Sequence, residues 1–182
     1  GDDIAPAYLP DGRIVFSSTR QRRSKAILLD EGKPQFEALN EGRNDPALLL
    51  HVMDSEGEDI QQITFNQSSD LDPVVLDSGK ILFTRWDNFS NRSAMNLYRV
   101  NPDGTALEFV YGMHSHDTGS DGSTVQFLKP AELEDGRIMV SLQPYASRAL
   151  GGDIVAIDIE NFTENDQPVY SSAGYSTSAQ AS

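Results

Sequence analysis

The sequence has no cysteine, few cations and no long hydrophobic run. Without cysteine, the chain cannot form disulfides, thiolate nucleophiles, Cys-ligated zinc sites or c-type haem attachments. Lys and Arg number 14 against 28 Asp and Glu, a net charge of −14, so the surface repels phosphate backbones and nucleic-acid binding is not expected. No apolar run approaches the roughly 18 residues of a membrane span, and the sequence shows no signal-peptide pattern.

Catalytic motifs are also missing. The sequence contains no Gly-x-Ser-x-Gly elbow, no Walker loop and no His-Glu-x-x-His helix. The 182 residues suit one domain or a piece of one, and the 38% hydrophobic content is enough for a core. These features favour a folded, non-catalytic domain over an enzyme.

One unit occurs three times along the chain. It consists of a proline, a glycine six residues later, a basic residue, three apolar residues and a Ser or Thr, at residues 6–17, 73–84 and 130–141. A second unit follows each copy and ends near residues 65, 111 and 170; its last copy lacks the glycine turn and matches least well. Agreement at several coupled positions indicates an internal structural repeat.

The repeated unit predicts hairpins of β-strands. Asp-Gly or Ser-Gly pairs supply the positive φ of tight turns, and the triplets at 14–16, 81–83 and 138–140 are apolar on consecutive positions. Because successive strand residues face opposite sides, such strands must be covered on both faces. This favours an all-β fold of four-stranded antiparallel blades, a β-propeller, over a flat sandwich with alternating polar and apolar positions.

The expected blades span about residues 1–66, 67–112 and 113–170, and residues 171–182 are a polar tail or the opening of a truncated blade. At roughly 40–50 residues per blade, the chain holds about three to four blades, whereas propellers close with roughly four to eight. We therefore expect a partial propeller, which belongs to a larger ring or completes one by self-association.

The repeat resembles that of TolB-like propellers. The matching pattern is Asp-x-x-Pro-x-x-x-x-Asp-Gly-Arg-Ile-Val-Phe-Ser-Ser-x-Arg from Asp3 to Arg20, and the middle copy from Asp72 to Asp87 is similar more narrowly to hydrazine synthase alpha subunit-like proteins. The resemblance covers roughly residues 2–160 and implies a periplasmic or secreted bacterial protein. The Cys-x-x-Cys-His motifs of a haem site are absent, so no haem site is carried over.

A first interruption of the repeat runs from about residue 21 to 46. Four of the 14 basic residues fall within six positions here: Arg20, Arg22, Arg23 and Lys25. Arg22 and Arg23 are candidates for binding an anion or an acidic partner; the alternative is a solvated loop that pairs with nearby carboxylates. A short helix is expected within residues 34–40, where Phe36 and Leu39 are three apart.

A second interruption contains His114, His116 and Asp117. In an extended segment the two imidazoles lie on the same side, and with a carboxylate they could hold a divalent metal, the one cofactor that the sequence suggests. The alternative is a polar loop between blades, whose histidines bond carbonyl groups. Binding of a non-metal ligand at the mouth of the ring falls within this alternative.

Trp86 follows a strand end between Arg85 and Asp87. It is a candidate for stacking on a ligand, and packing between blades is the alternative.

Three hypotheses follow for the function. The first is a non-catalytic scaffold that binds a protein or a small ligand within a larger periplasmic or secreted protein. The second is a platform domain of a redox or hydrolytic enzyme, with His114 and His116 near its site. The third is an assembly role, in which two chains complete one ring.

Overall fold

In the described residues the chain forms three antiparallel sheets and one helix. The computed structural model describes residues 1–40, 42–89, 92–113, 115–116, 124–144, 152–160, 168–171 and 176–178. The first sheet has the order β1 (Asp3–Tyr8), β2 (Ile14–Ser18), β3 (Leu49–Met53), β4 (Gln61–Gln62). The second has the order β5 (Asp70–Val75), β6 (Ile81–Phe89), β7 (Arg92–Val100), β8 (Glu108–Tyr111).

The third sheet has five strands. In chain order they are β9 (Val125–Glu132), β10 (Ile138–Pro144), β11 (Asp153–Ile157), β12 (Pro168–Ser171) and β13 (Ser176–Ser178), and they pair in that order. Two sheets thus have the predicted four strands, and the third has one more, because β13 falls within the segment 171–182.

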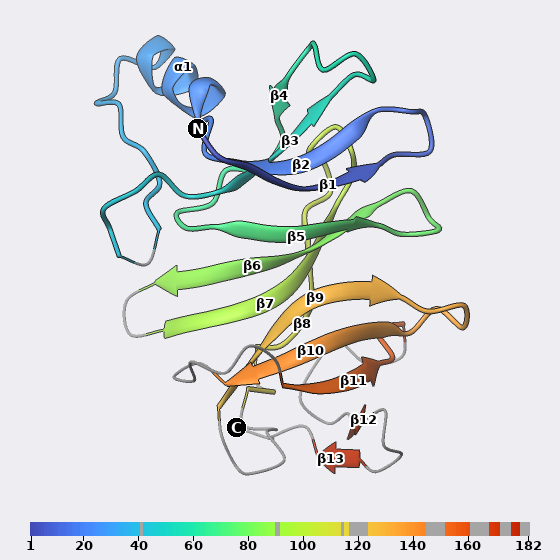
Figure 1. Ribbon diagram of the computed structural model, residues 1–182. Helices are drawn as coiled ribbons and strands as arrows, with labels where there is room; N and C mark the ends of the chain where they lie inside the picture. The colour runs from blue at the N-terminus through green and yellow to red at the C-terminus, as the bar shows by residue number, and fades with distance from the viewer. Residues whose placement is uncertain are drawn as a thin grey trace.

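The three sheets are stacked in chain order (Figure 1). β5 contacts β1, β2 and β3 of the first sheet, and β9 contacts β5, β6 and β7 of the second. The first strand of each unit thus lies next to the first strand of the following unit. The arrangement is consistent with part of a propeller, and the described residues close no ring.

The predicted turns have the expected backbone. Gly12, Gly79 and Gly136 have φ values of 90°, 81° and 82°, in the region that favours glycine. Each donates its N–H to a leucine carbonyl three residues earlier, at 2.8–3.0 Å. The sequence prediction of tight turns at these positions is confirmed.

A second backbone feature also recurs in each unit. Ala5, Asp72 and Lys129, each immediately before the repeat proline, have φ values of 51°, 51° and 52°. Around these residues the register shifts in the β1–β2, β5–β6 and β9–β10 pairs, as it does at a β-bulge. Three non-glycine residues with the same unusual φ at equivalent positions show that the sequence repeat is also a backbone repeat.

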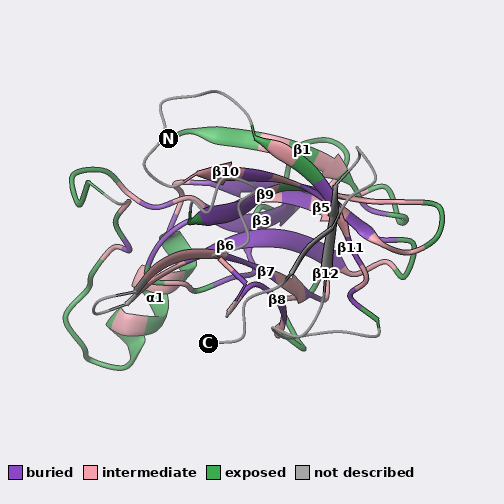
Figure 2. Cartoon of the chain, turned by 90° about the horizontal axis from the view of Figure 1, so that it is seen from below, coloured by how far each residue is buried: buried purple, intermediate pink, exposed green. Residues whose placement is uncertain are grey.

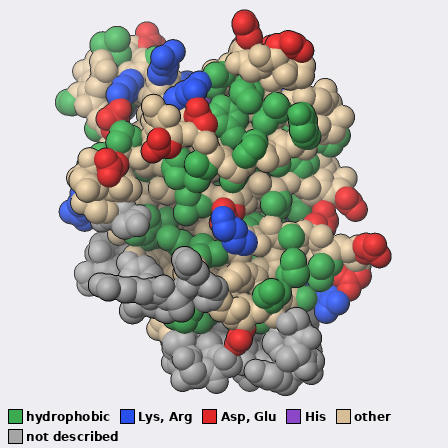
Figure 3. All heavy atoms as spheres, in the orientation of Figure 1, with side chains coloured by type: hydrophobic (Ala, Val, Ile, Leu, Met, Phe, Trp, Pro, Cys, Tyr) green, Lys and Arg blue, Asp and Glu red, His purple; other side chains and the backbone are tan. Residues whose placement is uncertain are grey.

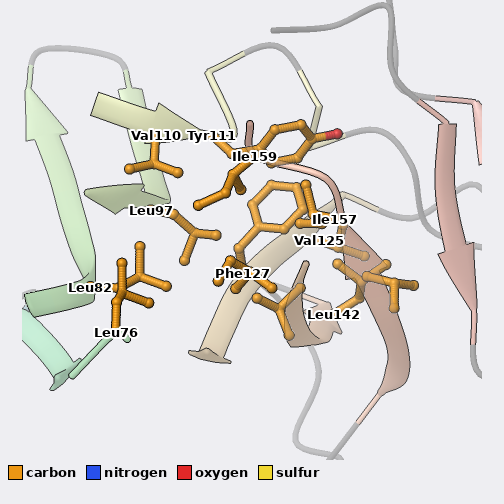
Figure 4. Packing of buried hydrophobic residues seen from close by; sticks show 13 residues of the cluster. Leu76, Leu82, Leu97, Val110, Tyr111, Val125, Phe127, Leu142, Ile157 and Ile159 are labelled. Atoms are coloured by element: carbon orange, nitrogen blue, oxygen red, sulfur yellow. The ribbon is translucent and has the colours of Figure 1, made fainter. Parts of the chain in front are cut away.

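The apolar triplet of the middle repeat is covered on both faces. Ile81 and Phe83 belong to a buried cluster with Val15 of the first sheet, whereas Leu82 belongs to a cluster with Phe127 of the third. Figure 4 shows the second cluster, with Leu76, Leu82 and Leu97 facing side chains of the third sheet. Full burial of such side chains contributes roughly 1.5–3 kcal/mol each, so the stacking of sheets supplies much of the stability. Figure 2 shows the buried residues in the middle of the sheets.

The Ser or Thr that ends each of the first two repeats joins one sheet to the next. Ser17 Oγ donates to the Asp70 carbonyl and Thr84 Oγ1 to the Phe127 carbonyl, both at 2.9 Å. Asp70 and Phe127 each lie three residues before the repeat proline. Both hydroxyl residues are fully buried, so the polar residue of the repeat serves as a joint between sheets.

The helix forms at a different place from the one expected. α1 (Arg22–Asp30) is helical, and residues 34–40 are not. The prediction was wrong because it rested on the spacing of two apolar residues alone. Residues 22–30 contain six good helix formers, of the types Arg, Lys, Ala and Leu, whereas residue 34 is proline. In the described part of the chain no helix has the length and hydropathy of a membrane span.

Candidate functional site

The insertion between β2 and β3 departs from the repeat. β7 begins soon after β6 ends, whereas β2 and β3 are separated by residues 19–48, which include α1. The helix ends where Gly32, with a φ of 66°, donates its N–H to the Leu29 carbonyl at 3.1 Å. α1 contains no buried residue, so polar contacts rather than a core must hold it in place.

Two buried glutamines hold the insertion against the first sheet. Gln21 donates its amide to the carbonyls of Ala38 and Ala47, at 2.9 and 3.1 Å, and accepts the Ala38 N–H at 2.8 Å. Gln62 in β4 donates to Ser24 Oγ at 2.7 Å and accepts the Ser24 N–H at 3.3 Å. These neutral side chains carry no motif signal, and the sequence analysis missed them.

Three arginines surround a hollow of about 280 Å³ beside the start of α1. Arg20 donates to Asp3 Oδ2 at 2.6 Å, and Arg23 donates to the Gln62 carbonyl at 3.1 Å. Arg22 is exposed and makes no hydrogen bond or ion pair with the described residues. Figure 3 shows Lys and Arg side chains gathered in the region of α1. The hollow is lined by Arg20, Arg22, Arg23, His51, Ile60, Gln61 and Gln62.

Two of the other three cations of the insertion are paired. Lys25 forms an ion pair with Glu37, and Lys33 with Glu31 at 2.6 Å. The expectation that nearby carboxylates balance the basic run therefore holds for Lys25. Arg22 differs, since its guanidinium faces the hollow without a described carboxylate partner.

His51 forms the inner wall of the hollow. It is buried, its Nδ1 lies 2.9 Å from the Leu49 carbonyl, and its ring packs on Phe16 with centroids 5.8 Å apart. Burial lowers the pKa of His51 below its ordinary value, although the carbonyls of Leu49 and Arg20 act in the opposite direction. The lowered pKa favours the neutral imidazole, so the positive charge of the hollow comes from its arginines.

The Asp3–Arg20 pair has a buried counterpart in the second sheet. Asp3 and Asp70 both lie three residues before the repeat proline. Arg85 binds Asp70 through two hydrogen bonds, Nε to Oδ1 at 2.8 Å and Nη2 to Oδ2 at 2.9 Å. The shared spacing to proline was the signal that could have identified Asp70 from the sequence.

The surroundings of Asp70 are polar and aromatic but closed to solvent. The Arg85 guanidinium lies over the rings of Phe83 and Tyr98, 5.4 and 5.1 Å from their centroids. Burial raises the pKa of Asp70 against the opposing charge of Arg85. Burial and the Asp87 carboxylate raise the pKa of Tyr98 to about 12. This cluster is buried between the first two sheets and is structural.

The predicted histidine site is described only in part. His114 and Asp117 lie outside the described residues. The two ring nitrogens of His116 lie 2.6 Å from the Val125 carbonyl and 2.8 Å from Asn96 Oδ1. Among the described residues no group of three or more His, Asp or Glu side chains could hold a metal. A metal bound by His114 and His116 stays a prediction.

Trp86 lies inside the second sheet. It is only 2% exposed, and its indole N–H donates to Ser93 Oγ at 3.1 Å. Its backbone N–H donates to the Ser69 carbonyl and its carbonyl accepts from Asn66. Its ring is packed within the protein, so no face is presented to a ligand in solution.

Comparison with solved structures gives a likeness of fold. No protein-family model and no curated protein match the sequence. Among solved structures, the chain is similar to Kuenenia stuttgartiensis hydrazine synthase, with a TM-score of 0.60 and 21% sequence identity over 87% of this chain. The chain spans 22% of the length of that protein chain. At this identity the likeness concerns the fold alone.

Proposed function

We propose that this chain forms three consecutive blades of a TolB-like β-propeller and serves as a binding scaffold, without a catalytic role, in a larger protein. The repeated bulges, the middle apolar triplet covered on both faces and the fold likeness to hydrazine synthase support the propeller. The proposal keeps the periplasmic or secreted location that the TolB-like resemblance implies.

The basic hollow is the proposed binding site, and its ligand is an acidic group of a partner. The observation that carries this proposal is Arg22, a guanidinium without a described partner beside Arg20 and Arg23 in a chain of net charge −14. A guanidinium presents a planar set of donors that matches a carboxylate. Since the rest of the molecule repels anions, an acidic partner binds favourably only where cations are concentrated.

Titration with polyglutamate at low ionic strength tests the proposal. We expect Arg22→Gln to weaken binding roughly two- to fivefold, the effect of one exposed charge contact. Lys33→Gln makes the same charge change in the same insertion, away from the hollow, and is the matched control. Equal losses in both variants, or no binding of polyglutamate, would refute an anion site at Arg22.

Further blades complete the proposed ring, from the same polypeptide or from a second copy. Ser141 ends the third repeat as Ser17 and Thr84 end the first two. The proposal therefore gives its hydroxyl the same role, donation to a carbonyl of a fourth blade. Light scattering tests self-association. A mass corresponding to two copies of the 20.0 kDa chain supports completion by a second copy, and the mass of a single chain opposes it.

A second candidate function is a platform domain of a redox or hydrolytic enzyme. The fold likeness to hydrazine synthase favours it. A Cys-x-x-Cys-His or hydrolase segment elsewhere in the same reading frame would support this candidate, and its absence would favour the scaffold.

A further inference from the structure

An apolar hollow of about 160 Å³ adjoins the basic one. Two contacts join them: Ser24, which lines the apolar hollow, is hydrogen-bonded to Gln62, and the Arg23 guanidinium lies 5.8 Å from the centre of the Phe65 ring. The two hollows are therefore neighbours along α1. The apolar hollow is lined by Gln21, Ser24, Ile27, Leu28, Phe36, Ala38, Phe65 and Asn66.

The apolar side chains around this hollow are exposed. Phe36 is 61% exposed, Phe65 51% and Ile27 42%. Of the ten exposed large hydrophobic side chains in the described residues, six lie in the insertion or line the two hollows: Ile27, Leu29, Phe36, Leu39, Ile60 and Phe65. Single exposed hydrophobics are ordinary, but a cluster rimmed by charge marks an interaction surface.

We propose that the two hollows form one recognition site for a peptide segment that carries a phenylalanine or leucine beside acidic residues. The inference rests on the proposed function and specifies its partner. An apolar cavity of about 150 Å³ admits a benzene ring, so the apolar hollow is large enough for one such side chain. The adjacent arginines then contact the neighbouring carboxylates.

Charge complementarity selects this occupant. A purely apolar segment gains nothing from Arg20, Arg22 and Arg23, and a purely acidic one leaves Phe36 and Phe65 exposed to water. A basic amphipathic segment is attracted to the acidic body as a whole and repelled at the hollow. A segment with both properties satisfies both parts of the surface.

Fluorescence anisotropy of short labelled peptides tests the inference. The main probe has glutamates on both sides of one phenylalanine, and a second probe replaces that phenylalanine by alanine. We expect the alanine probe to bind roughly tenfold more weakly, as expected when one large apolar side chain is no longer buried. We expect Phe36→Ala to weaken the main probe severalfold and to leave the alanine probe unchanged.

The matched control is Leu29→Ala, because Leu29 is 65% exposed in the same insertion but does not line the apolar hollow. Equal midpoint temperatures of thermal unfolding show that both variants fold. NMR titration of the unmodified chain with the main probe locates the site without any substitution, and shifts confined to residues away from the two hollows would overturn the inference.

The outcomes separate the inference from the proposed function. If both probes bind equally and depend on Arg22, the acidic site stands and the combined site is wrong. If the phenylalanine matters but Arg22 does not, the anion site itself fails. Binding to vesicles of anionic lipid that the main probe does not compete for would assign the surface to a membrane and also overturn the inference.

Discussion

The first and second sheets carry the same kind of ion pair in different surroundings. Asp3–Arg20 and Asp70–Arg85 both involve the aspartate three residues before the repeat proline. The side chains of the first pair are 37% and 38% exposed, whereas those of the second are 0% and 9% exposed. The second sheet has a neighbouring sheet on each side, and the first has one in the described residues.

The neighbouring side chains follow the same correspondence. Phe16 pairs in register with His51, and Phe83 pairs in register with Tyr98, with ring centroids 5.8 and 6.3 Å apart. In the second sheet this group is sealed by the first sheet and stabilises the fold. In the first sheet it borders the basic hollow. The same local arrangement thus forms a structural joint in the second sheet and the wall of the proposed binding site in the first, depending on what covers it.

The largest effect is expected from removing Arg85. Arg85→Gln leaves the Asp70 carboxyl buried without its cation, and we expect a loss of about 3–5 kcal/mol in the free energy of unfolding. Urea denaturation measures this loss. Replacing both partners by apolar residues of similar volume, Asp70→Leu with Arg85→Met, should recover most of it. A loss below about 1 kcal/mol for Arg85→Gln would show that the buried pair does not differ from an exposed one.

A smaller effect is expected from pH at His51. Because burial lowers its pKa in the folded chain, the unfolded chain takes up a proton first as the pH falls. The free energy of unfolding should decrease below pH ~6.5, by at most about 1.4 kcal/mol per pH unit, until the folded-state pKa is reached. His51→Tyr places a tyrosine opposite Phe16, as Tyr98 lies opposite Phe83 in the second sheet. This variant should remove the dependence of the unfolding free energy on pH in this range. Denaturation between neutral and mildly acidic pH measures the difference, and identical profiles would contradict the prediction.

The smallest effect is expected for Arg20. Since its pair with Asp3 is exposed to solvent, Arg20→Gln should cost about 0.2–1 kcal/mol, less at high salt. Urea denaturation at two salt concentrations tests this estimate. A loss of unfolding free energy as large as that for Arg85→Gln would mean that the Asp3–Arg20 pair is also shielded from solvent. The proposed difference between the two sheets would then be wrong.

The strands could be predicted from the sequence, because apolar triplets and glycine turns are local patterns of neighbouring residues. Phe83 between two sheets and Gly79 in its turn follow directly from the pattern. Arg22 and Arg23 were also recognisable, since charge density is visible without a structure. By contrast, Gln21 bonds residues 17 and 26 positions away, and Asp70 meets Arg85 across a bulged strand pair. Such contacts depend on register and tertiary packing, which no local pattern specifies.

The bulge before each proline has a consequence for solubility. β1, β5 and β9 are edge strands of their sheets, and an open edge invites another strand to add to it. Pro6, Pro73 and Pro130 offer no N–H there, and the adjacent left-handed residues interrupt the line of hydrogen-bonding groups. The repeat therefore carries its own protection against aggregation through these edges, renewed in every copy.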